Sequence, residues 1–427
     1  MIQKFEKIES INGELELKGD KSISHRAVMF AAMAEGESII HNCSDSEDVR
    51  STMNCFIQLG CKFELFNESI KVSGKGFKGF LKPVNDLYAG NSGTTARLMS
   101  GILAAQKFET VITGDESLSK RPMRRIVEPL RSMGCDISVS EEGIMPIHIN
   151  PSSNIKAVNY KLRVASAQVK SALILCAIHL DEESVIIEPV PTRNHTEKLL
   201  GLKTEKDSTW TKIFVSKKDY PQPFEITVPS DISSASFFIV LALLTRNSEI
   251  VIKNVSLNET RTGVIDILKQ MGGSIEIENQ TEVKREMVGD LRVYSSDLKN
   301  ISIPETIISN IIDEIPILSV AGAFAEGNFR ITGAKELRVK ESDRIKSLCQ
   351  NFAKAGLTIT EFEDGFELSG KVSDKNVTFE SYGDHRIAMA FGVMSMLMEN
   401  GGKVNDFESV AVSNPQFVDQ INKLRQQ

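Results

Sequence analysis

Residues 22–33 read SISHRAVMFAAM, an apolar stretch that opens on serine, histidine and arginine. Because almost every residue after Arg26 is apolar, a helix here has no polar side to turn toward water and is predicted to be buried on most of its surface. Similar apolar helices with polar openings recur along the chain, and the openings contain Ser22, Ser92, Ser166, Asp231, Asp313 and Asp384. These positions lie 65 to 82 residues apart, so we predict six copies of one structural unit.

The first copy shows the expected order of elements. Asp45 or Ser46 caps a second, amphipathic helix, Gly60 ends it, and Asn67-Glu68 forms the turn of a hairpin. After the buried helix we therefore predict a strand at 38–42, the amphipathic helix at 45–59, and two strands at 61–65 and 70–72.

The same order follows Thr95 and Asp313, which indicates βαβαββ-type units in a two-domain α/β protein with three units per domain. The copy that includes Leu202 to Tyr220 is the least regular. A solenoid is the alternative, but solenoid repeats run to about 20–50 residues, and these are longer. The best domain boundary lies between Tyr220 and Pro229, halfway through the copies.

Composition narrows the class of protein. The chain has 427 residues, 41% of them hydrophobic and 25% charged, with a net charge of −7, which argues against a general nucleic-acid binder. Its six cysteines show no spacing suited to zinc, so we expect buried free thiols in a reducing cytoplasm. No apolar run approaches the roughly 18 residues of a membrane span, and the first residues lack a signal-peptide core. We expect a globular cytoplasmic protein.

Cations gather at corresponding places in the copies. Any single arginine is most simply a solvated surface residue, but arginine also suits bidentate contact with phosphate or carboxylate, and helix N-termini add partial positive charge. The recurrence therefore predicts a site for a small polyanion. The cations concerned are Lys21, Arg26, Arg97, Lys120, Arg121, Arg124, Arg125, Arg193, Lys340, Arg344 and Arg386.

Acidic residues lie among these cations. Asp313 and Asp384 are most simply helix N-caps, and Glu341 is a favourable charge in a first helical turn. A carboxylate beside a lysine can also exchange protons with a substrate. These residue types alone leave both interpretations open.

Six ordered motifs resemble those of the 5-enolpyruvylshikimate-3-phosphate synthase family, an enolpyruvyl transferase family. The resemblance runs from about residue 8 to 420 and is weakest over 202–222. The motifs are GDKSISHR at 19–26, GNSGT at 90–94, KRPM at 120–123, SAQVK at 166–170, RVKESDR at 338–344 and GDHR at 383–386.

The resemblance implies a two-domain inside-out α/β barrel in which each domain has three βαβαββ repeats and the domains close on the substrates. It implies an upper domain at 20–229, a lower domain at 1–19 plus 230–427, and a two-strand hinge near 19–20 and 229–230. It also implies transfer of the enolpyruvyl (1-carboxyvinyl) group of phosphoenolpyruvate to the 5-hydroxyl of shikimate 3-phosphate, with release of phosphate. That reaction lies on the shikimate pathway to chorismate and the aromatic amino acids. A monomer without metal or organic cofactor, and without nucleic-acid or membrane partners, is expected.

Site residues follow by motif. Asp313 is expected to accept a proton, Glu341 to donate one to the enol carbon, and Lys21 to bridge both substrates. Shikimate 3-phosphate is expected at Lys21, Ser22, Arg26, Ser166, Gln168, Arg193, Asp313 and Lys340. Phosphoenolpyruvate is expected at Lys21, Gly93, Arg121, Gln168, Arg344 and Arg386.

The chain departs from the family pattern at three places. Many relatives carry a phosphoenolpyruvate-binding lysine near the C-terminus, where this chain reads Val412-Ser413-Asn414-Pro415. Ala167 stands where some members have a second serine, and Ser230 replaces the usual glycine before Asp231. The first two departures put individual substrate contacts in doubt.

Two alternatives to this function remain. One is the enolpyruvyl transferase that acts on UDP-N-acetylglucosamine, but it usually has a cysteine in the loop before its Arg-Pro, and residues 113–120 contain none. The other is a catalytically inactive ligand-binding paralogue, which the complete set of Lys21, Asp313, Glu341, Arg344 and Arg386 disfavours.

Overall fold

The computed structural model describes residues 1–373 and 375–425, and the chain divides into two compact units. The 19–228 unit comprises Gly19–Val228 together with Glu282–Glu286. The 229–425 unit comprises Met1–Lys18, Pro229–Thr281 and the chain from Met287 onward. Each unit has its own hydrophobic core.

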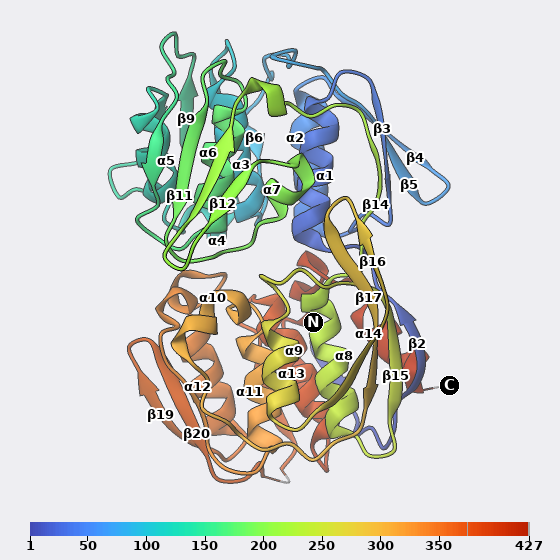
Figure 1. Ribbon diagram of the computed structural model, residues 1–427. Coiled ribbons are helices and arrows are strands. Elements are labelled where there is room, and N and C mark those ends of the chain that lie inside the picture. The colour runs from blue at the N-terminus through green and yellow to red at the C-terminus, as the bar shows by residue number, and fades with distance from the viewer. Residues whose placement is uncertain (374, 426–427) are drawn as a thin grey trace. The chain divides into compact units, whose positions relative to one another are not determined.

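Three apolar helices form the core of the 19–228 unit (Figure 1). They are α1 (Lys21–Met33), α3 (Gly93–Ala104) and α6 (Ala167–Ala177). Their residues are buried almost without exception, as the sequence predicts. Helices α3 and α6 pack so closely that a Cβ added at Gly101 would lie 2.1 Å from the Ala172 carbonyl oxygen. Glycine is therefore required at this contact.

Three four-stranded sheets surround these helices, and all three repeat one pattern. In each, the first two strands are parallel and the remaining neighbours are antiparallel. The orders are β14 (Glu225–Thr227)-β3 (Glu37–His41)-β5 (Ser69–Ser73)-β4 (Lys62–Phe66), β6 (Leu87–Tyr88)-β7 (Thr110–Thr113)-β9 (Ile147–Asn150)-β8 (Asp136–Ser138), and β10 (Asn159–Lys161)-β11 (Ser184–Glu188)-β13 (Thr211–Val215)-β12 (Thr204–Lys206). The irregular copy thus keeps the pattern with short strands.

Local signals in the first copy are confirmed. Ser46, not Asp45, caps the second helix by accepting a hydrogen bond from the Val49 amide. Asn67 and Glu68 have φ of 46° and 61°, as a tight hairpin turn requires. The other helices of the unit are α2 (Glu47–Gln58), α4 (Glu116–Ser119), α5 (Arg124–Ser132), α7 (His195–Leu200) and the 3-10 turn Lys217–Asp219.

In the described residues, the 229–425 unit also combines three buried helices with three sheets, but two of these sheets are three-stranded. Its core helices are α8 (Ile232–Leu244), α11 (Ile315–Phe324) and α13 (His385–Leu397), which pack against one another (Figure 1). Its sheets are β16 (Ser274–Val283)-β17 (Glu286–Tyr294)-β15 (Glu249–Ser256)-β2 (Asn12–Glu16), β18 (Phe329–Ile331)-β20 (Gly365–Ser369)-β19 (Thr358–Phe362) and β1 (Gln3–Phe5)-β22 (Gly402–Asn405)-β21 (Val377–Glu380). The remaining helices are α9 (Gly263–Gln270), α10 (Ile308–Ile311), α12 (Arg344–Lys354), α14 (Phe417–Arg425) and the 3-10 segments Glu305–Ile307, Lys335–Val339 and Phe407–Val412.

Two predicted helix starts are wrong. Helix α11 begins at Ile315, and Asp313 does not cap it because its carboxylate is held by Arg344 and Lys340. Helix α12 begins at Arg344 with Asp343 as its N-cap, so Glu341 precedes the first turn. Asp313 instead pairs with cations about 30 residues further along the chain, and Glu341 pairs with Arg344 three residues on, at the start of α12.

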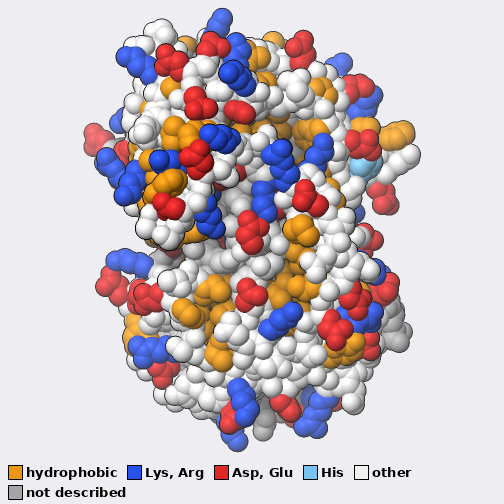
Figure 2. Space-filling view, in the orientation of Figure 1, with side chains coloured by type: hydrophobic (Ala, Val, Ile, Leu, Met, Phe, Trp, Pro, Cys, Tyr) orange, Lys and Arg blue, Asp and Glu red, His pale blue; other side chains and the backbone are white. Residues whose placement is uncertain are grey.

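The six cysteines and Ser230 lie inside the protein. All six cysteines are buried free thiols, as predicted, and burial raises the pKa of Cys55 to about 12. On the face shown in Figure 2, acidic and basic side chains are interspersed over each unit. Ser230 is buried, and its hydroxyl donates to the Leu17 carbonyl oxygen at 3.1 Å.

In residues 1–373 and 375–425, no single helix is both long and apolar enough to cross a membrane. Residues Glu305–Ile311 and Ile315–Phe324 pass the same length and composition test only as a pair bent by 115°. Buried core helices also pass this test, and most of α11 is buried.

One buried histidine gives an expected pH dependence of stability. Burial lowers the pKa of His179 to about 4, although the Leu175 carbonyl oxygen, 2.9 Å from Nδ1, acts in the opposite direction. The unfolded chain therefore binds the proton first as pH falls, so the contribution to stability is complete above about pH 6.5 and is lost toward pH 4.

We expect His179→Phe to remove about 2 kcal/mol of the stability lost between pH 7.5 and 5. Phenylalanine keeps a ring beside Phe77 and Tyr220, whose centroids lie 5.7 and 5.4 Å from the imidazole. Urea unfolding at both pH values measures the change, with the exposed His148→Phe as control. An unchanged pH dependence in His179→Phe would show that this imidazole is not responsible.

Candidate active site

Lys21 is the first residue of α1 and lies at a capped helix start. Asp20 caps the helix by accepting a hydrogen bond from the Ile23 amide at 2.9 Å. Lys21 Nζ lies 2.9 Å from Asp48 Oδ2, and the two side chains are 17% and 11% exposed. Asp48 thus fixes the ammonium group, a role that no signal in the sequence indicated.

Arg26 joins three helices. Its Nε donates to Thr196 Oγ1 at 2.7 Å, Nη2 to Ser171 Oγ at 3.0 Å, and Nη1 to the Ser22 carbonyl oxygen at 2.9 Å. Burial lowers the pKa of Arg26 to about 10, although the Glu197 carboxylate acts in the opposite direction. The guanidinium therefore remains charged near neutral pH. Ser171 and Thr196 fix it, and sequence reasoning missed both.

The start of α3 brings together two arginines around a glycine. Arg121 Nη2 donates to Asn91 Oδ1 at 2.6 Å, and Arg97 Nη1 donates to Gln168 Oε1 at 2.6 Å. A Cβ at Gly93 would lie 3.0 Å from Arg97 Nη1 and 3.6 Å from Arg121 Nη1. Glycine thus leaves space beside both guanidinium groups at a helix N-terminus, an arrangement suited to an anion.

The segment that carries Arg193 is held by a buried lysine. Lys170 Nζ lies 2.8 Å from Glu197 Oε1 and 3.0 Å from Glu188 Oε1. Burial opposes the charge of Lys170, but these two carboxylates outweigh burial and raise its pKa. The contacts join α6 to the ends of β11 and α7, with Arg193 between them. Ser166 begins α6 as its N-cap.

In the 229–425 unit, three carboxylates surround Arg344. Its Nε lies 2.7 Å from Asp384 Oδ2, Nη2 lies 2.5 Å from Glu341 Oε2, and Nη1 lies 3.1 Å from Asp313 Oδ1. Burial opposes the guanidinium charge, but Asp384, Glu341 and Asp313 outweigh it and raise the pKa of Arg344. Arg344 is therefore permanently charged, and each of its nitrogens contacts a carboxylate.

Asp313 connects this arginine to the remaining cations. Lys340 Nζ lies 3.5 Å from Asp313 Oδ1, and Arg386 Nη2 lies 3.8 Å from Asp313 Oδ2. Arg386 Nη1 also donates to the Asp313 carbonyl oxygen at 2.9 Å. The five site residues predicted in this unit, Asp313, Lys340, Glu341, Arg344 and Arg386, are thus in one connected group.

Asp384 has two roles at the start of α13. It is the predicted N-cap, because Oδ1 accepts from the Arg386 amide at 2.9 Å. It also orients Arg344 through Nε and Nη2.

The missing C-terminal lysine has no obvious substitute in its own segment, where the Asn414 amide donates to Gln420 Oε1 at 2.8 Å. Within residues 1–373 and 375–425, no group of three or more His, Cys, Asp or Glu side chains is arranged to hold a metal.

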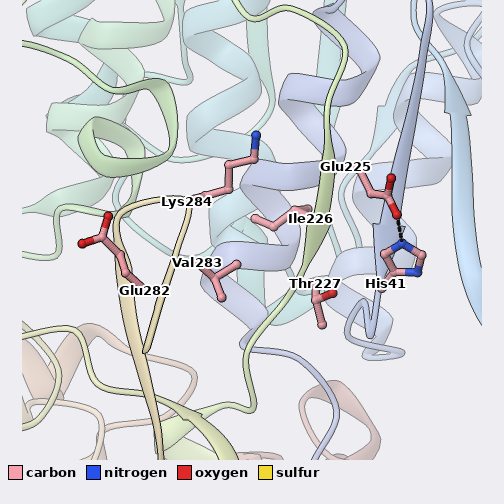
Figure 3. A pocket seen from close by; sticks show the side chains of 7 residues that line it. All are labelled: His41, Glu225, Ile226, Thr227, Glu282, Val283 and Lys284. Atoms are coloured by element: carbon pink, nitrogen blue, oxygen red, sulfur yellow. Dashed lines mark hydrogen bonds and ion pairs between the residues drawn. The ribbon is translucent and has the colours of Figure 1, made fainter. Parts of the chain in front are cut away.

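A surface groove of about 600 Å³ lies elsewhere in the 19–228 unit (Figure 3). Figure 3 shows His41 facing Glu225, with Nε2 and Oε1 2.7 Å apart, and Lys284 on the opposite wall. The predicted site residues do not line it. The groove is therefore distinct from the residues described above, and we assign it no chemistry.

Comparison with known proteins identifies the family. The sequence profile described as EPSP synthase (3-phosphoshikimate 1-carboxyvinyltransferase) matches residues 5–421. The chain belongs to the EPSP synthase family. The 3-phosphoshikimate 1-carboxyvinyltransferase of Petrotoga mobilis is 46% identical over 423 residues, covering 98% of each chain. That of Thermoanaerobacter sp. (strain X514) is 44% identical, covering 97% of this chain and 98% of its own.

Solved structures of the EPSP synthase family agree with this assignment. EPSP synthase from Acinetobacter baumannii has a TM-score of 0.86 and 39% identity and covers 99% of this chain and 98% of its own. The enolpyruvyl transferase NikO from Streptomyces tendae has a TM-score of 0.76 at 12% identity and covers 99% of this chain and 97% of its own, a similarity of fold alone. The predicted α/β fold class is thereby confirmed.

Proposed function

We propose that the protein is a 3-phosphoshikimate 1-carboxyvinyltransferase. It transfers the enolpyruvyl group of phosphoenolpyruvate to the 5-hydroxyl of shikimate 3-phosphate and releases phosphate, on the route to chorismate. The observation that carries the proposal is the group formed by Asp313, Glu341 and Lys340 around Arg344 and Arg386. It combines two proton-exchanging carboxylates with two arginines that can bind an anionic donor.

The reaction needs two proton transfers and one bond to carbon. The 5-hydroxyl loses a proton to Asp313 and attacks C2 of phosphoenolpyruvate, while Glu341 gives a proton to C3. The tetrahedral adduct then loses phosphate, and a methyl proton returns to the protein, so the enol ether is formed. Lys21 contacts both substrates, and the arginines stabilise charge as it moves from the enol to the leaving phosphate.

Arg344 is already held by carboxylates before the donor binds. Each of its guanidinium nitrogens contacts one, and Asp384 holds it through two nitrogens. A guanidinium has five N–H donors, so an anionic donor bound at Arg344 takes the N–H that these contacts leave or replaces Asp313 or Glu341.

Residues of both units take part in this proposal. Shikimate 3-phosphate is assigned to Lys21, Ser22, Arg26, Ser166, Gln168, Arg193, Asp313 and Lys340, and phosphoenolpyruvate to Lys21, Gly93, Arg121, Gln168, Arg344 and Arg386. The domains proposed are 20–229 and 1–19 plus 230–427, with three repeats each and a hinge near 19–20 and 229–230. We also propose a cytoplasmic monomer, and the six free buried thiols support a reducing compartment.

Release of phosphate tests this function. We expect phosphate to appear from phosphoenolpyruvate only when shikimate 3-phosphate is also present, because protonation of C3 without an acceptor hydroxyl gives no adduct. A coupled phosphate assay with each substrate omitted in turn measures this. Binding of both substrates without phosphate release would instead indicate an inactive paralogue.

A further inference from the structure

The start of α8 has no substrate role in the proposed function, yet its side chains form a buried cluster that extends to Arg386. Ser233 Oγ donates to Glu314 Oε1 and accepts from Arg261 Nη2. Arg261 Nη2 also lies 3.8 Å from Asp231 Oδ1 and 3.8 Å from Glu314 Oε1. The cluster therefore connects the starts of two core helices, α8 and α11, with Arg261, which lies two residues before the start of α9.

Glu314 is the central group of this cluster. Its side chain is 0% exposed, and Oε1 lies 3.6 Å from Arg386 Nη1. The same Nη1 donates to the Asp313 carbonyl oxygen at 2.9 Å. The Glu314 carboxylate and the Asp313 carbonyl oxygen thus both contact Nη1 of Arg386. These contacts restrict the orientation of the guanidinium group.

Each carboxylate in this cluster faces a guanidinium group. Asp231 faces Arg261, and Glu314 faces both Arg261 and Arg386, the second of which it shares with Asp313. A buried charge that loses its partner is costly, so Glu314 resists any movement of Arg386 that would leave it uncompensated. Glu314 occupies the N-cap position of α11 but makes no side-chain capping bond, so helix capping does not explain its presence.

We propose that Glu314 is a positioning residue that holds Arg386 in the orientation that receives the donor. Ser233 and Arg261 support it from behind, and Glu314 itself does not touch substrate. The proposal rests on the proposed function in one respect, namely that Arg386 binds phosphoenolpyruvate. The proposal thus gives the polar start of α8, the fourth of the six helix openings, a role in donor binding.

Glu314→Gln tests the proposal with little change in size. Glutamine still accepts from Ser233 but removes the charge that faces Arg386, so we expect the Kd and KM for phosphoenolpyruvate to rise about tenfold. The KM for shikimate 3-phosphate should change less than about twofold. Asp290→Asn is the matched control, because Asp290 is a buried carboxylate of the same unit, 2.9 Å from Lys253 Nζ. This control should leave both KM values unchanged.

A double-mutant cycle separates positioning from general destabilisation. In an Arg386→Gln background, Glu314→Gln should weaken phosphoenolpyruvate binding by less than about twofold, because the two residues act through one guanidinium. Additive effects, equal losses for both substrates, or tighter donor binding in Glu314→Gln would each overturn the proposal. If Glu314→Gln does not fold, Ser233→Ala is used instead. We expect Ser233→Ala to raise the Kd for phosphoenolpyruvate about threefold. An unchanged Kd in that variant would contradict the proposal.

Calorimetric titration with phosphoenolpyruvate keeps this test separate from the proposed function. A wild-type protein that binds phosphoenolpyruvate but does not transfer it would contradict the function. The Kd values of the variants would still decide whether Glu314 positions Arg386.

Discussion

Replacing Glu341 by glutamine is expected to lower kcat by about 10²- to 10⁴-fold, because glutamine carries no proton for the enol carbon. Binding should persist, since the amide oxygen can still accept from Arg344 Nη2, now 2.5 Å from the carboxylate. Arg344 also keeps Asp313 and Asp384. The Kd values of both substrates should therefore change by less than about threefold.

Single-turnover experiments with both substrates at saturating concentration measure this loss directly. The control is Glu363→Gln, which removes an exposed carboxylate of the same unit that pairs with Lys335 at 2.5 Å. We expect the control to react at the wild-type rate. Unchanged turnover in Glu341→Gln would remove this carboxylate from the mechanism.

Arg344→Lys is expected to affect both activity and stability. Lysine keeps the charge but cannot reach Asp384, Glu341 and Asp313 simultaneously, because one ammonium replaces a planar fork of donors. We expect kcat/KM for phosphoenolpyruvate to fall by at least about 10²-fold. Loss of charged hydrogen bonds should also lower the free energy of unfolding by about 2–3 kcal/mol.

Steady-state kinetics and urea unfolding measure the two effects separately. Arg330→Lys is the control, because Arg330 is 60% exposed and pairs with a single carboxylate, Glu367. A matched loss of stability in both variants, or normal donor kinetics in Arg344→Lys, would contradict the central role of Arg344.

The apolar helices and their polar starts could be predicted because each signal is local. The run after Arg26 has no polar side, and Ser46 and Asp384 cap the helices that follow them. The residue types of Asp313 and Glu341 leave a helix-start role and a site role open, and the helix-start role is wrong for both. Glu341 precedes α12 and pairs with Arg344 three residues on. Asp313 is 31 residues from Arg344, and only packing reveals that the ion pair prevails over the cap.

The partners of the site residues were harder to predict than the residues themselves. Ser171 and Thr196 are buried hydroxyl residues of α6 and α7, and nothing but their contact with Arg26 distinguishes them. Glu314 directly follows the site residue Asp313, but its role depends on Arg261 and Ser233, which come from another copy of the repeat. No sequence pattern marks hydroxyl and carboxylate side chains that act by holding another site residue.

Product analysis with exchanged acceptors tests the central claim most directly. The protein is incubated with phosphoenolpyruvate and either shikimate 3-phosphate or UDP-N-acetylglucosamine, and products are followed by phosphorus NMR and mass spectrometry. We predict equal amounts of phosphate and the enolpyruvyl ether of shikimate 3-phosphate, and no transfer to the UDP-sugar. Transfer to the UDP-sugar, or no ether although both substrates bind, would contradict the account.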